Sequence, residues 1–216
     1  MDDDPIGQAG VTARRLEQLS GTRRDAGRSI MWAAFNLRAA RMGARIAAEL
    51  GSGSAGLARL RAVFDEQWDV LEIGAMSLGF EDVMSALDLC ANAIYLASGG
   101  QPASDGKYKD LGWWKPGHLA TLSGTPNTLR WVSELQADSE RQILEHCRAM
   151  LTHRAVPRHI FRGAGGAPTP PLTEIRIPAV GSSPAQRVSI GVLIPRLVQF
   201  GDNQFERCCA ALLADY

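Results

Sequence analysis

Apolar residues recur with helical spacing along much of this 216-residue chain. Between residues 30 and 48 they fall at i, i+3, i+4 and i+7, which predicts one face of an α-helix. A second apolar stripe follows the same segment, and we expect a helix that is apolar on two sides to run through the centre of a bundle. The first stripe contains Ile30, Ala33, Ala34, Leu37, Ala40, Ala44, Ala47 and Ala48, and the second contains Met31, Phe35, Met42 and Ile46.

The same periodicity predicts further helices over residues 57–75, 80–95 and 126–151, and a closing helix from Pro195 onwards. Thr125 is the expected N-cap of the 126–151 helix, with Pro126 at its first helical position. Because the stretch "SELQADSERQ" is polar, we expect the first half of that helix to project from the bundle into solvent.

Proline and glycine separate these helices from two irregular regions. Six of the eleven prolines fall between residues 157 and 184, where they exclude a long helix. Within that region "TEIRIPA" and "QRVSIGV" alternate apolar and polar residues, which favours a small β-hairpin. The sequence therefore predicts an all-α domain over 1–216, a bundle of about five helices. We expect a flexible acidic N-terminus at 1–10, a long inserted loop at 101–125 and a Pro/Gly-rich excursion at 155–189 before the last helix.

The charge of the chain is balanced in total and uneven in distribution. Lysine plus arginine and aspartate plus glutamate both number 23, so net charge does not favour a polyanionic partner. Residues 14–45 hold eight arginines, residues 65–88 are acidic, and residues 141–162 hold five arginines and one acid. Such blocks are typical of neighbouring helices with complementary faces. Only three lysines accompany the arginines, a bias typical of a GC-rich bacterial genome.

The cysteines and the first residues of the chain indicate the cellular compartment in which we expect the protein. The four cysteines show no Cys-x-x-Cys spacing and lie in apolar helical patterns, so we expect buried, reduced thiols and a cytoplasmic protein. The opening "MDDDPIGQAG" lacks the basic and apolar regions of a signal peptide. Because no apolar run approaches ~18 residues, we expect no membrane span. Nucleotide-binding glycine motifs are also missing, and we expect no cofactor.

The most basic stretch is "RAMLTHRAVPRH" at residues 148–159. Arg148 and His153 fit the pattern Arg-x4-His. This resembles the signature of the HEPN superfamily, helical bundles of about five helices whose Arg-x4–6-His motif lies on a late helix. The resemblance covers residues 28–154 by helix order and two residues by chemistry.

The resemblance implies a metal-independent endoribonuclease, or a protein that binds RNA or a nucleotide, acting as a homodimer. In the family's ribonucleases the arginine holds the charge that develops on phosphorus, and the histidine acts as general acid–base. Carried over, Arg148 is the phosphate clamp and His153 the acid–base, whose reference pKa of ~6.5 suits both directions of proton transfer. Arg154, Arg158 and Arg162 would add phosphate affinity.

Other interpretations of these residues stay open. The same spacing recurs as Arg141…His146 and Arg154…His159. Arginines and histidines in a last helical turn also interact favourably with its carbonyl end, so the stretch could simply cap the helix. A metal site at His146 and His153 lacks the carboxylate or histidine pairs such a site needs, and we expect no metal.

The second unusual stretch is "GWWKPGH" at residues 112–118. Trp113 and Trp114 could contact a partner or stack on bases, since aromatic residues concentrate at binding hot spots. Alternatively, one of them anchors the long loop by closing an end of the bundle. The competing function class is therefore a non-catalytic helical module that binds a partner protein or a second copy of itself.

Overall fold

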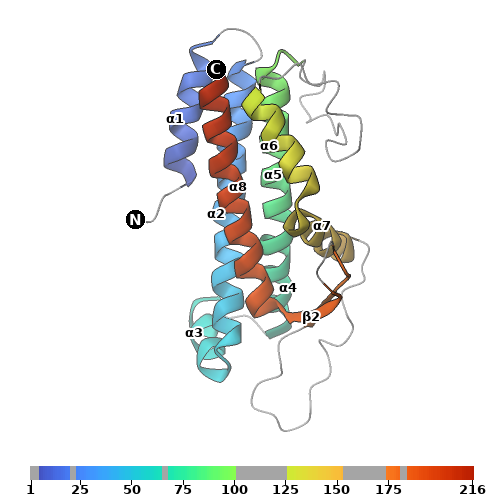
Figure 1. Cartoon of the computed structure of the whole chain (residues 1–216). Coiled ribbons are helices and arrows are strands. Elements are labelled where there is room, and N and C mark those ends of the chain that lie inside the picture. The colour runs from blue at the N-terminus through green and yellow to red at the C-terminus, as the bar shows by residue number, and fades with distance from the viewer. Residues whose placement is uncertain (1–4, 20–22, 65–67, 101–125, 153–173, 181–183) are drawn as a thin grey trace. The chain divides into compact units, whose positions relative to one another are not determined.

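The computed structural model describes residues 5–19, 23–64, 68–100, 126–152, 174–180 and 184–216. Helices dominate these residues, with one small late hairpin, so the predicted all-α class is confirmed (Figure 1). The 57–75 and 126–151 segments each form two helices where one was predicted. The elements are α1 (Pro5–Glu17), α2 (Arg23–Gly51), α3 (Ser54–Phe64), α4 (Trp68–Met76), η1 (Ser77–Glu81), α5 (Asp82–Ala97), α6 (Pro126–Ala137), α7 (Ser139–Thr152), β1 (Glu174–Ile177), β2 (Gln186–Ser189) and α8 (Ile190–Asp215).

The described residues group into two compact units, where the sequence predicted a single domain. Unit 1 comprises those within Met1–Arg38, Ser85–Asp138 and Gly201–Tyr216. Unit 2 comprises those within Ala39–Met84 and Ser139–Phe200. Helices α2, α5 and α8 each contribute residues to both units, because the division falls inside them.

Helix α1 is a feature that sequence analysis missed. It begins at Pro5, so residues 5–10 are helical instead of belonging to a flexible terminus. Ala9, Ala13 and Leu16 are buried, with i, i+4 and i+7 spacing. A Cβ at Gly27 would lie 3.2 Å from the carbonyl oxygen of Ala13, so α1 packs backbone-close against α2.

Helix α6 is packed, not projecting. Thr128, Trp131, Val132 and Leu135 are buried, and the indole Nε1 of Trp131 donates a 3.0 Å hydrogen bond to the carbonyl of Gln204 on α8. The prediction that this helix extends into solvent was wrong. Its few apolar side chains are large and share one face, so they suffice to bury that face.

Tertiary contacts also complete the start of α6. Pro126 holds its first position as predicted, while the expected cap Thr125 lies outside the described residues. The carboxylate of Asp215, at the end of α8, accepts hydrogen bonds from the Thr128 N–H at 2.8 Å and from the Asn127 amide at 2.6 Å. This carboxylate satisfies a backbone donor that the helix itself leaves unpaired.

Unit 2 is built around a π-helical turn, η1, that joins α4 to α5. A Cβ at Gly43 of α2 would lie 2.9 Å from the backbone nitrogen of Gly79 and 3.0 Å from the carbonyl oxygen of Ala75. A Cβ at Gly79 would lie 2.4 Å from Ile194 of α8. Helices α2 and α8 therefore pack so closely on the π turn that neither Gly43 nor Gly79 has room for a Cβ.

The predicted hairpin is present in unit 2. Strands β1 and β2 pair antiparallel, with Ile175 opposite Val188 and Ile177 opposite Gln186. Ile175 and Ile177 are buried and alternate with exposed residues, which is the period-two pattern that predicted them. None of the helices in the described part combines the length and hydropathy needed to cross a bilayer.

Candidate functional site

Of the predicted catalytic pair, only Arg148 lies within the described residues. Arg148 lies on α7, one turn before that helix ends at Thr152, and its side chain is half-exposed. The buried stripe of α7, formed by Ile143, Leu144 and Cys147, faces the core of unit 2. His153 lies outside the described residues, and so do the other predicted contact residues: Arg154, Arg158, Arg162, Trp113 and Trp114.

The first of the three Arg-x4-His pairs has a structural task. The Arg141 side chain is only 7% exposed, and its guanidinium donates to Glu145 at 3.0 Å. His146 makes a 3.2 Å hydrogen bond from Nε2 to the carbonyl oxygen of Arg176 on β1. Arg141 therefore serves α7 itself, and His146 fastens the hairpin to that helix.

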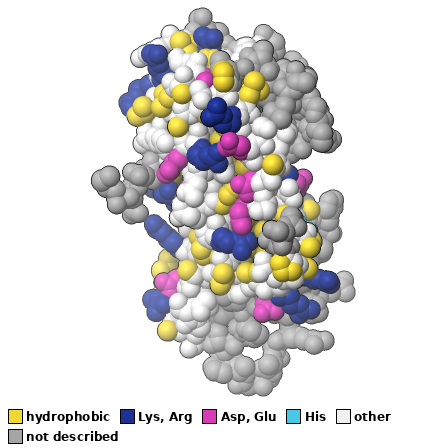
Figure 2. Space-filling view, viewed as in Figure 1, with side chains coloured by type: hydrophobic (Ala, Val, Ile, Leu, Met, Phe, Trp, Pro, Cys, Tyr) yellow, Lys and Arg dark blue, Asp and Glu magenta, His cyan; other side chains and the backbone are white. Residues whose placement is uncertain are grey.

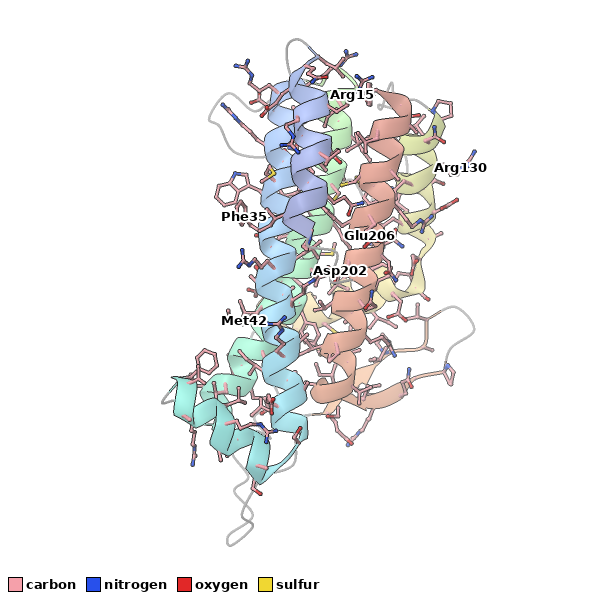
Figure 3. The ribbon with its side chains drawn as sticks, turned by 90° about the vertical axis from the view of Figure 1, so that its left-hand side faces the viewer. Arg15, Phe35, Met42, Arg130, Asp202 and Glu206 are labelled. Carbon is pink, nitrogen blue, oxygen red and sulfur yellow. The ribbon has the colours of Figure 1, made fainter. Side chains whose placement is uncertain are left out.

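A different surface emerges on the part of α2 that belongs to unit 1. Trp32 is 57% exposed and Phe35 is 44% exposed, and their ring centroids lie 5.8 Å apart with planes inclined at 57°. Figure 3 shows Phe35 pointing away from the bundle. At ~100° per residue these rings and three arginines fall within an arc of about 120°. We call this set the aromatic face of α2: Arg24, Arg28, Trp32, Phe35 and Arg38.

The opposite side of the same helix segment is core. Ile30, Ala33, Ala34 and Leu37 are fully buried, as the first apolar stripe predicted. The second stripe is divided: Phe35 and Met42 are exposed, whereas Ile46 is buried. The alternation of these apolar residues with Arg28, Arg38 and Arg45 was the available signal, since arginine is rarely fully buried. Trp32 was not among the contact residues predicted from the sequence.

The aromatic face is positively charged. Its three arginines, Arg24, Arg28 and Arg38, share their part of α2 with one acid, Asp25. Arg28 pairs with Asp25 at 3.2 Å, with side chains 68% and 38% exposed. Among the described residues, Arg24 and Arg38 are exposed and form no ion pair. A ligand at this face would therefore meet unneutralised guanidinium groups.

A shallow groove of about 280 Å³ lies between α6 and α8 of unit 1. It is lined by alanines of α8 and by Arg130, Trp131, Glu134 and Arg207. Arg207 is ion-paired with Glu134, and Figure 2 shows such mixed charges side by side on this face. The pairing leaves Arg130 as the one lining cation with no partner among the described residues, so the groove offers little for an anion.

The buried cysteines of the described residues are poor candidates for a nucleophile. All four cysteines are free and buried, as predicted. Burial raises the pKa of Cys147 and of Cys209 to about 12, which suppresses thiolate formation. Burial and the neighbouring Glu81 raise the pKa of Asp82. No three His, Cys, Asp or Glu side chains in the described part are placed to hold a metal ion.

Comparison of the chain with protein-family models, with curated proteins and with solved structures finds no match. The likeness to HEPN proteins therefore rests on the Arg-x4-His spacing and the helix order alone.

Proposed function

We propose that this protein is a non-catalytic binding module whose contact surface is the aromatic face of α2. The observation that carries the proposal is the exposure of Trp32 and Phe35 as adjacent rings on a helix whose other side is fully buried. Single exposed apolar residues are ordinary, but contiguous aromatic ones flanked by arginine have the composition of interface hot spots. No catalytic group is needed for this function.

The proposal predicts a partner whose retention depends on both rings. We would purify the full-length protein from the cells that make it naturally, as the wild type and as Trp32→Ala/Phe35→Ala. The double variant should lose the co-purifying protein while its helicity and unfolding midpoint stay close to wild type, because neither ring belongs to the buried core. The matched control is Val192→Ala, a substitution of another exposed apolar residue, at 63%. Equal retention by all three proteins would contradict the proposal.

A second candidate is RNA cleavage in the manner of HEPN nucleases. One observation favours it: Arg148 lies half-exposed near the end of a late helix of a helical protein. In this function Arg148 stabilises the charge on phosphorus and His153 moves the 2′-hydroxyl proton. Arg154, Arg158 and Arg162 supply phosphate affinity in a homodimer.

This candidate is tested with Arg148→Ala and His153→Ala in metal-free buffer containing a chelator. Each should abolish the release of 2′,3′-cyclic phosphate products from single-stranded RNA and leave the circular dichroism spectrum unchanged. Arg130→Ala is the control, because that exposed arginine lies on α6, away from the motif in sequence. Equal cleavage by wild type and both variants removes the candidate.

A further inference from the structure

We propose that the partner held by the aromatic face of α2 is an acidic amphipathic helix of another protein. This inference rests on the proposed function and adds the chemistry of the partner. It follows from the charge, shape and side-chain spacing of the face, taken in turn.

The charge of the face determines the sign of the charge that its partner carries. Arg24 lies two turns before Trp32 and Arg38 lies one turn after Phe35, so cations stand at both ends of the aromatic pair. Asp25 pairs with Arg28, but neither Arg24 nor Arg38 has an ion-pair partner among the described residues, so two guanidinium charges of the face remain uncompensated. Carboxylates beside an apolar stripe would complement this arrangement.

Spacing and shape favour a helix. Arg28, Trp32 and Phe35 stand at i, i+4 and i+7, the spacing at which one helix presents anchors to another. Trp32 and Phe35 are exposed and three residues apart, so they belong to one ridge of side chains on α2. A neighbouring helix accepts such a ridge between its own rows of side chains.

A second copy of this chain is a poor occupant. Because arginines lie on both sides of the aromatic pair, parallel and antiparallel self-association would each bring guanidinium groups together. Like charges across an interface suppress the wrong partner. The same face in two copies offers no carboxylate except Asp25, which Arg28 already engages.

Nucleic acid and lipid fit less well. Two rings inclined at 57° and in contact with each other cannot both lie parallel to successive stacked bases. A helix that binds a bilayer buries a broad apolar side, whereas the broad apolar side of α2 is already core. Both alternatives become outcomes of the test.

The test uses three synthetic 21-residue helical peptides and the full-length protein in calorimetric titrations. The first carries leucines at i, i+3, i+4 and i+7 with flanking glutamates. The second keeps the leucines and replaces each glutamate by lysine. The third keeps the glutamates and replaces each leucine by serine. We expect only the first to bind, and Trp32→Ala/Phe35→Ala to weaken it by at least about tenfold.

Charge reversal supplies an independent check. Arg24→Glu/Arg38→Glu should lose the acidic peptide and gain the lysine peptide, which a merely structural role of these exposed arginines would not produce. The matched control is Arg61→Glu, an exposed arginine of α3. It should change neither affinity by more than about threefold.

The outcomes separate this inference from the proposed function. If the acidic and lysine peptides bind equally well and both need Trp32 and Phe35, the face binds proteins but the acidic partner is wrong. If no peptide binds and the natural partner is still lost in the double variant, the helical partner is wrong. Ring-dependent binding of single-stranded RNA or anionic vesicles, or a ring-dependent homodimer in sedimentation, also overturns the inference. Acidic-peptide selectivity that inverts on charge reversal supports it.

Discussion

The buried cysteines pack as small apolar side chains, although a thiol is also a reactive group. The thiols of unit 1 show this clearly. Cys208 directs its sulfur toward the carbonyl of Cys90 at 4.0 Å, and both thiols are fully buried. Cys209 has a pKa of about 12, chiefly because burial excludes water from the thiolate, and Cys147 of unit 2 is raised in the same way.

These raised pKa values predict that the folded protein loses stability at alkaline pH. Below pH 9 each thiol is protonated in both states and has no effect on stability. Between pH 9 and about 12 the unfolded chain loses the proton while the folded chain keeps it. The free energy of unfolding should therefore fall by about 1.4 kcal/mol per pH unit for each thiol. Urea unfolding from pH 8 to pH 11 measures this slope.

The contribution of each thiol is isolated by Cys147→Ala and Cys209→Ala. Each variant should show a shallower alkaline slope than wild type, whatever stability its smaller side chain costs at pH 8. Slopes equal to that of wild type would mean that these thiols ionise as freely in the folded protein as in the unfolded one.

Among the elements, the π turn η1 governs how closely helices approach in unit 2. A Cβ on Gly43 would clash with the backbone nitrogen of Gly79 in this turn and with the carbonyl oxygen of Ala75 in α4, and backbone atoms cannot move aside as a flexible side chain can. Gly74, in neighbouring α4, has no atom within 4 Å of a Cβ built on it. The two glycines therefore make a matched pair in one unit.

We expect alanine at these positions to have opposite effects. Gly43→Ala should destabilise the protein by about 1–3 kcal/mol, because it forces the helices apart. Gly74→Ala should stabilise it by about 0.5–1 kcal/mol, because alanine at this helical position lowers the conformational entropy of the unfolded chain. Thermal and urea unfolding give both values, and a change of the same sign at both positions would contradict the close packing at η1.

The start of α6 offers a second test at this scale. Asp215→Ala removes the carboxylate that accepts the Thr128 N–H, and should cost about 0.5–2 kcal/mol. Asp215→Asn keeps an acceptor and should cost less. The control is Glu206→Ala at an exposed position of α8. Hydrogen exchange at the first amides of α6 should accelerate in the Asp215→Ala variant only.

For the molecule as a whole, a net charge of zero conceals separate basic regions that serve the two candidate functions differently. RNA held by Arg148, Arg154, Arg158 and Arg162 would release counterions at four contacts. With a slope of about −0.7 per contact, a tenfold rise in salt should weaken RNA binding ~600-fold. Binding of an acidic helix relies mainly on buried rings, with rim charges worth about 1 kcal/mol or less each.

Salt titration therefore discriminates between the functions in one protein. Between 50 and 500 mM salt, the acidic peptide should lose no more than about thirtyfold in affinity. RNA binding by the His153→Ala variant, which cannot cleave, should follow the steep dependence if that function is real. A shallow salt dependence for RNA would count against phosphate recognition by these arginines.

Much of the architecture is written locally in the sequence. The spacing of Ile30, Ala33 and Leu37 predicts the buried side of α2, and the alternation around Ile175 and Ile177 predicts β1. Gly99 and Gly100 mark the end of α5. Such features are set by the 3.6- and 2-residue periods of the backbone and by the φ freedom of glycine, which each segment carries regardless of its neighbours.

Which side of a helix stays exposed depends on what packs against it. The sequence by itself determined that α2 has two apolar stripes, and only the tertiary structure decided that Phe35 and Met42 of the second stripe are exposed. It likewise decided that Asp215 caps a helix 87 residues away in sequence, and that Arg141 and His146 have structural partners. The physical reason is the same in each case: periodicity is a property of one segment, whereas burial and hydrogen-bond partners are supplied by another.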